Sequence, residues 1–138
     1  MSEYTLSKTV TQPYAQTVNA VKAGLADQGF GVLTEIDLAA TLHTKLGVTI
    51  PPQVILGACR PELAYEAIQA DPSIAAVLPC NVVVRTIDET TTIVEAFDPN
   101  AMVGLSPTTH GSAENESPLA TVAADARQRL TALLDHLN

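Results

Sequence analysis

The chain has 138 residues, of which 46% are hydrophobic and 4% aromatic, and this is the size of one ordinary domain. Seven Lys and Arg residues against 15 Asp and Glu residues give a formal net charge of −8. This charge argues against nucleic acid and against an anionic membrane surface as partners. A chain of this length buries roughly two-thirds of its unfolded surface, so it needs no disulfide or metal to fold.

The N-terminus and the hydrophobic runs predict a cytoplasmic protein. The first residues lack the basic segment and apolar run of a secretory signal. No apolar stretch reaches the ~18 residues of a membrane span, and Pro51-Pro52 interrupts the longest candidate. In a reducing compartment the two cysteines are expected to be thiols.

Hydrophobic spacing in the first part of the chain predicts two strands, each followed by a helix. Residues 3–10 alternate as a strand does, and the next apolar stripe predicts a helix of about four turns that ends at Gly29. Residues 30–36 predict a second strand. Asp37 can cap a short helix that Gly47 then ends.

The middle of the chain predicts three more strands and one helix. Residues 54–59 are apolar without alternation, which is typical of a strand buried on both faces. Pro61 is suited to the first turn of a helix. Residues 82–87 and 91–97 are rich in β-branched side chains and predict a hairpin.

These elements predict an α+β fold: a mixed, mostly antiparallel sheet of about five strands with helices packed on one face. We expect residues 1–103 to form the domain. Residues 104–117 have no periodicity and many helix-breaking residues, which predicts a flexible loop. Residues 118–138 carry a clean apolar stripe and predict a C-terminal amphipathic helix that packs on the same domain.

Two cysteines stand beside prolines at predicted strand ends, in Cys59-Arg60-Pro61 and Pro79-Cys80-Asn81. A helix start and a cationic neighbour both stabilise a thiolate, so the sequence predicts a lowered pKa for Cys59. Cys80 has no such neighbour. The alternative is that both are small buried hydrophobic residues. Whether the thiols meet depends on how the chain returns between them.

Other enzyme motifs are absent from the sequence. There is no phosphate-binding glycine loop and no G-x-S-x-G nucleophile motif. The 21-residue separation of the cysteines is not a zinc-ribbon spacing. A closed zinc site would need two further ligands, and His43, His110 and His136 are poorly placed in sequence to supply them.

Several linked blocks resemble the DUF302 family, a family of unknown function. They are Gly29 to Asp37, Ile55 to Pro61 with its Cys-x-Pro, and Leu78 to Val84 with its Pro-Cys. The resemblance covers roughly residues 5–103. It implies a compact α+β fold, dimerisation with a second copy, and a hallmark pair at Cys59 and Cys80, but it supplies no reaction.

Three functions stay open at this point, and the sequence does not decide whether the protein is an enzyme. The first is a binding module in which Cys59, Arg60 and Cys80 bind a small thiol-reactive ligand, or the two thiols a soft metal ion. The second is a thiol-dependent enzyme or redox protein with Cys59 as the thiolate. The third is a structural homodimer whose cysteines are packing residues. Neither a cofactor nor a catalytic residue follows from the sequence.

Overall fold

The computed structural model describes residues 4–105 and 118–137 of the chain. Its strands are β1 (Thr5–Val10), β2 (Gly31–Asp37), β3 (Gln53–Cys59), β4 (Cys80–Asp88) and β5 (Thr91–Phe97). Its helices are α1 (Tyr14–Asp27), α2 (Leu38–Leu46), α3 (Pro61–Ala70), α4 (Asn100–Val103), α5 (Pro118–Asp135) and the 3₁₀ helix η1 (Pro72–Val77).

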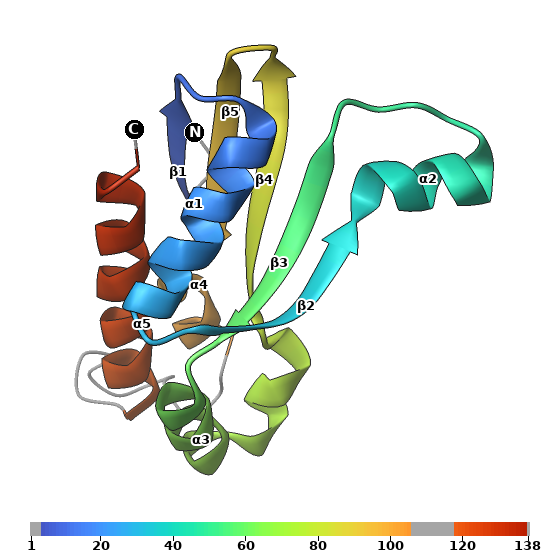
Figure 1. Cartoon of the computed structure of the whole chain (residues 1–138). Helices are drawn as coiled ribbons and strands as arrows, with labels where there is room; N and C mark the ends of the chain where they lie inside the picture. Colours follow the sequence, from blue (N-terminus) through green and yellow to red (C-terminus); the bar gives the residue numbers. More distant parts are fainter. Residues whose placement is uncertain (1–3, 106–117, 138) are drawn as a thin grey trace.

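The five strands form one sheet in the order β1-β5-β4-β3-β2 (Figure 1). Every neighbouring pair is antiparallel, so the predicted α+β fold with a five-stranded sheet is confirmed. The sheet contains no parallel pair in the described residues, whereas a mixed sheet was expected. The β4–β5 hairpin is confirmed, with Glu89 and Thr90 as its turn.

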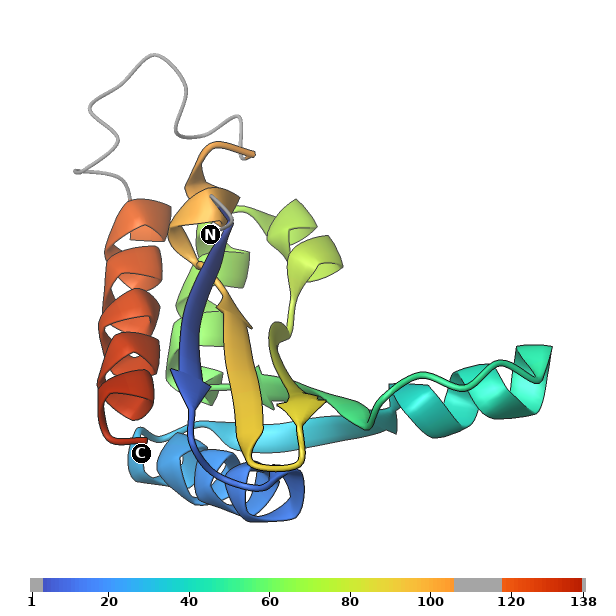
Figure 2. The ribbon, with the colours of Figure 1, turned by 90° about the horizontal axis from the view of Figure 1, so that it is seen from above.

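Helices α1 and α5 cover one face of the sheet (Figure 2). Alternate residues of β3, β4 and β5 point to this face and are buried, because side chains in a strand alternate between the two faces. The main core consists of these residues and the apolar stripes of the two helices. Its strand members are Val10, Val54, Leu56, Ala58, Val82, Val84, Val94 and Ala96.

The opposite face of the sheet carries half-buried side chains, including Gln53 and Ile55 of β3 and Val83 of β4. The expectation that residues 54–59 are buried on both faces therefore holds only in part. Gly57 is buried on this second face but Ile55 is half-buried, since no helix among the described residues packs across it. We call this second surface the open face.

A second apolar cluster lies beyond one end of the sheet, where α3, η1 and α4 meet the first half of α5. Its members are Leu63, Ala67, Ile74, Met102, Leu119, Val122 and Ala126. The short elements η1 and α4 lack a periodic signal in sequence, and their packing is decided by this cluster. The long helix α5 contributes to both clusters and so joins them.

Local signals for helix ends are confirmed. The Asp37 carboxylate accepts a hydrogen bond from the Ala40 amide at 2.9 Å, as a helix N-cap does. Gly47 ends α2 with φ +72°, and Gly29 follows α1 with φ +84°. Both are left-handed conformations that glycine adopts without strain.

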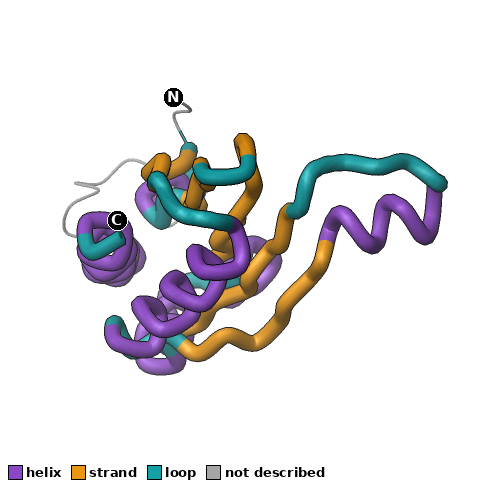
Figure 3. Tube along the Cα trace, turned by 45° about the horizontal axis from the view of Figure 1, so that its top comes forward, coloured by secondary structure: helices purple, strands orange, loops and turns teal. Residues whose placement is uncertain are grey.

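One part of the chain departs from the expected layers. Strand β2 and helix α2 extend away from the body of the protein (Figure 3), and α2 has no buried residue. The predicted loop 104–117 lies almost wholly outside the described residues, while α5 begins at Pro118 as predicted. Within the described residues, no helix combines the length and hydrophobicity needed to cross a bilayer.

Candidate functional site

The sheet topology brings the two cysteines to the same end of neighbouring strands. Cys59 ends β3 and Cys80 begins β4, and the ladder places Cys80 directly opposite Ala58. Helix α3 and η1 carry the chain out and back between the two strands (Figure 1). The thiols are therefore neighbours in space rather than a strand length apart.

Both cysteines are free thiols and line one small pocket between the two apolar clusters. Ala58, which pairs with Cys80, and Cys59 are consecutive residues, and consecutive residues of a regular strand face opposite sides of the sheet. Cys59 nevertheless lines the same pocket as Cys80, and it is the last residue of β3, where the chain turns into α3. The pocket has a volume of about 30 Å³. It is lined by Phe30, Ala58, Cys59, Arg60, Leu63, Ala64, Ala67, Leu78, Pro79, Cys80, Met102, Val122 and Ala126.

Burial raises the pKa of both thiols. Cys80 is 8% exposed, and burial together with the nearby Cys59 raises its pKa to about 11. The pKa of Cys59 is also raised, first by burial and then by the negative charge of Glu62. Because desolvation disfavours a thiolate, both side chains are protonated at neutral pH.

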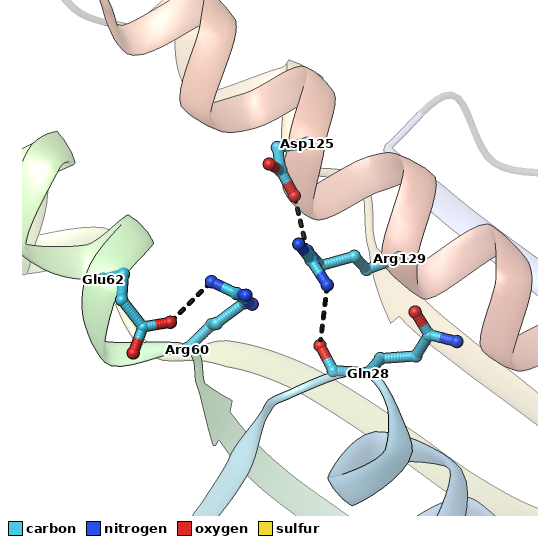
Figure 4. Close-up of polar contacts among 5 residues, drawn as sticks. All are labelled: Gln28, Arg60, Glu62, Asp125 and Arg129. Atoms are coloured by element: carbon cyan, nitrogen blue, oxygen red, sulfur yellow. Dashed lines mark hydrogen bonds and ion pairs between the residues drawn. The ribbon is translucent and has the colours of Figure 1, made fainter.

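The expected lowering of the Cys59 pKa is therefore wrong. Arg60 follows Cys59, but its guanidinium is paired with a carboxylate: Nη1 of Arg60 lies 2.6 Å from Oε2 of Glu62 (Figure 4). The carboxylate of Glu62 largely neutralises the positive charge of Arg60. The negative charge of Glu62 also raises the pKa of the Cys59 thiol. The sequence shows that Arg60 is adjacent to Cys59 but not which group it binds.

Arg60 also packs closely against the residue that follows α1. A Cβ atom built on Gly29 would lie 2.9 Å from Nε of Arg60, so a side chain here would push Arg60 aside, and the φ of +84° also favours glycine. The Nε atom is buried and has no hydrogen-bond partner among the described residues. The Arg60 side chain therefore lines the pocket and packs against the turn between α1 and β2.

A second arginine ties α5 to the same region. Arg129 donates from Nε to the Asp125 carboxylate at 2.5 Å and from Nη1 to the Gln28 carbonyl at 3.3 Å (Figure 4). The spacing of Asp125 and Arg129 by one helical turn is visible in sequence. The contact with Gln28 is not, because it joins residues far apart in the chain.

Met102 is a sulfur-containing pocket residue that no motif in the sequence identifies. It lies on the short helix α4, is 2% exposed and lines the same pocket as Cys59 and Cys80. Its thioether is a soft sulfur donor like a thiolate. The only sequence signal is a lone methionine in a segment without periodicity, which also fits an ordinary core residue.

The histidines add no ligand to this site. His43 lies on α2, in the part that extends away from the body, and exposed His136 contacts the Ala132 carbonyl through Nδ1 at 2.6 Å. His110 lies outside the described residues. No cluster of three or more His, Cys, Asp or Glu side chains that could hold a metal occurs among residues 4–105 and 118–137.

The sequence matches the family model described as "Domain of unknown function DUF302" over residues 6–137. The chain belongs to the DUF302 family. This match includes α5, beyond the 5–103 segment that carried the resemblance. No curated protein matches the chain.

A solved structure shares the whole fold. The crystal structure of the uncharacterized conserved protein DUF302 from Bacillus stearothermophilus is 28% identical to this chain, with a TM-score of 0.83. The similarity covers 99% of this chain and 100% of that chain. Because it spans nearly every residue, the segment that includes β2 and α2 is part of the matched length.

Proposed function

We propose that this DUF302 protein is a binding module for a soft metal ion, with Cys59, Cys80 and Met102 as the sulfur donors. The observation that carries the proposal is that the side chains of Cys59, Cys80 and Met102 line one small pocket. Thiolates and thioethers favour soft ions such as Cu(I) over Mg²⁺, Ca²⁺ or Mn²⁺.

The size of the pocket favours an ion over an organic ligand. A volume of about 30 Å³ holds one or two water-sized groups, whereas sites for small organic molecules measure about 300–1,000 Å³. A thiol-reactive organic ligand would therefore need the pocket to open. A single ion has a size that suits a pocket of this volume.

The donor set argues against zinc. Structural zinc is held by four ligands, and the pocket offers two thiols and one thioether. Soft monovalent ions accept two or three sulfur donors. The guanidinium of Arg60 stays bound to Glu62 in this arrangement. Arg60 therefore lines the site but does not bind the ion.

Metal binding at this site would be strongly dependent on pH. Each thiol that binds an ion must first release its proton, and the pKa values of both thiols are raised. Affinity should therefore rise steadily with pH across the neutral range. The same raised pKa values disfavour the alternative of a thiol enzyme with Cys59 as a ready nucleophile.

The test is an anaerobic Cu(I) titration in competition with a chromogenic Cu(I) chelator. We expect one ion per chain, and loss of binding in the Cys59→Ala/Cys80→Ala double variant. Met102→Leu keeps the side-chain volume and should weaken binding at least about tenfold, or about 1.4 kcal/mol. Leu78→Val, which changes a pocket residue without a donor, is the matched control. Binding that survives in the double variant, or no binding at all, would overturn the proposal.

A further inference from the structure

A groove on the open face of the sheet is separate from the thiol pocket, with which it shares only Pro79 among the described residues. Its volume is about 520 Å³, and sites for small organic molecules measure about 300–1,000 Å³. The groove therefore has the size of a small-molecule site. It is lined by Tyr4, Thr5, Gln53, Val77, Pro79, Asn81, Val83, Arg85, Glu95, Phe97 and Leu105.

The middle of the sheet forms the polar end of this groove. Gln53 of β3 lies directly opposite Arg85 of β4, and Glu95 of β5 lies directly opposite Val83 of β4. Side chains on neighbouring strands at these positions point to the same face, so a carboxamide, a guanidinium and a carboxylate lie together. Arg85 and Glu95 form an ion pair, with Nη2 of Arg85 2.9 Å from Oε1 of Glu95.

This ion pair leaves one group of each partner available. Nε and Nη2 of Arg85 both donate to the same carboxylate oxygen, Oε1 of Glu95. Nη1 of Arg85 and Oε2 of Glu95 have no hydrogen-bond partner in residues 4–105 and 118–137. A positively charged donor and a negatively charged acceptor therefore face the groove side by side.

The edge of the sheet nearest η1 forms the apolar end of the groove. Phe97 lies two residues beyond Glu95 on β5 and so faces the same side of the sheet. Val77 and Pro79 directly precede β4, which begins beside the end of β5. The chain has only three Tyr and two Phe residues, and Tyr4 and Phe97 both line this groove.

We propose that the groove binds a free α-amino acid with an apolar side chain. The carboxylate of the amino acid accepts a hydrogen bond from Nη1 of Arg85, and its ammonium group donates one to Oε2 of Glu95. An α-amino acid carries both charges on one carbon atom, which matches two protein charges only 2.9 Å apart. Its side chain lies against Phe97 at the apolar end, where burial adds to binding.

Charge complementarity selects this ligand class over others. An anion on Arg85 would also face the carboxylate of Glu95, and a cation on Glu95 would also face the guanidinium of Arg85, so a single charge meets repulsion. An uncharged apolar molecule would cover both charged groups without giving them a partner, which is costly. A long peptide separates its terminal charges and can satisfy only one of the two groups.

The first test is isothermal titration calorimetry of the full-length protein with single amino acids. L-phenylalanine and L-leucine are expected to bind saturably, with one molecule per chain. Glycine lacks the apolar side chain and should bind at least about tenfold more weakly. N-acetyl-L-phenylalanine lacks the positive charge and L-phenylalaninamide lacks the negative charge, so each should also bind at least about tenfold more weakly than L-phenylalanine.

Two variants assign each ligand charge to its protein partner. Arg85→Gln should weaken L-phenylalanine binding and bring its affinity close to that of L-phenylalaninamide, because the carboxylate then has no partner. Glu95→Gln should do the same for L-phenylalanine and N-acetyl-L-phenylalanine. Arg127→Gln is the matched control, since it breaks an ion pair with Asp98 outside the groove and should leave binding unchanged. Circular dichroism confirms that each variant is folded.

The proposal is overturned if neither L-phenylalanine nor L-leucine binds saturably at concentrations up to about 10 mM. It is also overturned if either capped derivative binds as tightly as L-phenylalanine, which would show that the groove takes a single charge. Unchanged binding in Arg85→Gln and Glu95→Gln would place the ligand elsewhere and overturn it as well. Sedimentation at the mass of two chains without amino-acid binding would show instead that a second copy occupies the open face.

Discussion

Cys80 lies directly opposite Ala58 in the β3–β4 ladder, one residue from Cys59. Because of this register, the two thiols are neighbours. Burial, rather than a helix dipole, decides the direction in which their pKa values shift. The consequence is a pair of protonated thiols in a small apolar pocket with Met102.

We expect both thiols to react slowly with an alkylating reagent near neutral pH, and Cys59 to react before Cys80. Only the thiolate reacts, and burial raises the pKa of both groups. Cys59 is half-buried, whereas Cys80 is buried. Mass spectrometry of time points, with Cys59→Ala and Cys80→Ala as controls, assigns each rate. A fast Cys59 with a pKa below that of free cysteine would contradict the electrostatics described above.

The free energy of unfolding should fall as pH rises from about 9 to about 11. The pKa of Cys80 is about 11 in the folded protein and near 9 when exposed, so the unfolded chain loses its proton first. A raised folded-state pKa gives stability that is complete below pH 9 and is lost through pH 11. Two pKa units correspond to about 3 kcal/mol as an upper bound.

Urea unfolding at several pH values measures this dependence. Cys80→Ala should remove most of the loss of unfolding free energy between pH 9 and pH 11. Cys59→Ala should remove less of it, because Cys59 is more exposed. Equal slopes in the wild type and in Cys80→Ala would show that other groups cause the loss of stability at high pH.

Gly29→Ala should destabilise the protein by about 1–3 kcal/mol. The residue has φ +84°, and an added Cβ would lie 2.9 Å from Nε of Arg60. Both the backbone and the contact oppose a side chain there. Gly104→Ala is the matched control, since its φ is −69° and an added Cβ would lie within 4 Å of no other part of the described chain beyond its immediate neighbours. Thermal unfolding compares the two, and equal melting temperatures would refute the argument.

Gly24→Ala should also destabilise, by about 1–3 kcal/mol, although alanine is the better residue in a helix. A Cβ on Gly24 would overlap Cδ1 of Leu133, so this glycine permits the close approach of α1 and α5. On propensity alone the same change would stabilise by up to about 1 kcal/mol. The sign of the measured change in unfolding free energy therefore decides whether the contact with α5 outweighs helix propensity.

Local features of the fold could be predicted from the sequence because they depend on neighbours along the chain. The Asp37 cap, the glycines that follow α1 and α2, and Pro61 at the start of α3 all act within a few residues. The β4–β5 hairpin is likewise set by one short turn. Periodicity identified the apolar side of α5 for the same reason.

The candidate site could be predicted only in part. Cys59, Arg60 and Cys80 line one pocket, and their role in binding stays a prediction. The predicted direction of the Cys59 pKa shift was wrong. Met102 was missed because its place in the pocket depends on the packing of α4 against α5. The open face was missed because an apolar strand looks the same in sequence whether one face or both are covered.

Short-range spacing and composition predicted the strands, the longer helices, the α+β class and the family resemblance, but not η1 and α4. Tertiary contacts alone make the two thiols neighbours, pair Glu62 with Arg60 and direct α2 away from the body. Each of these depends on contacts between distant segments or on which surfaces stay uncovered. Charge and burial act through space, and their effect on Cys59 follows the fold rather than the order of residues.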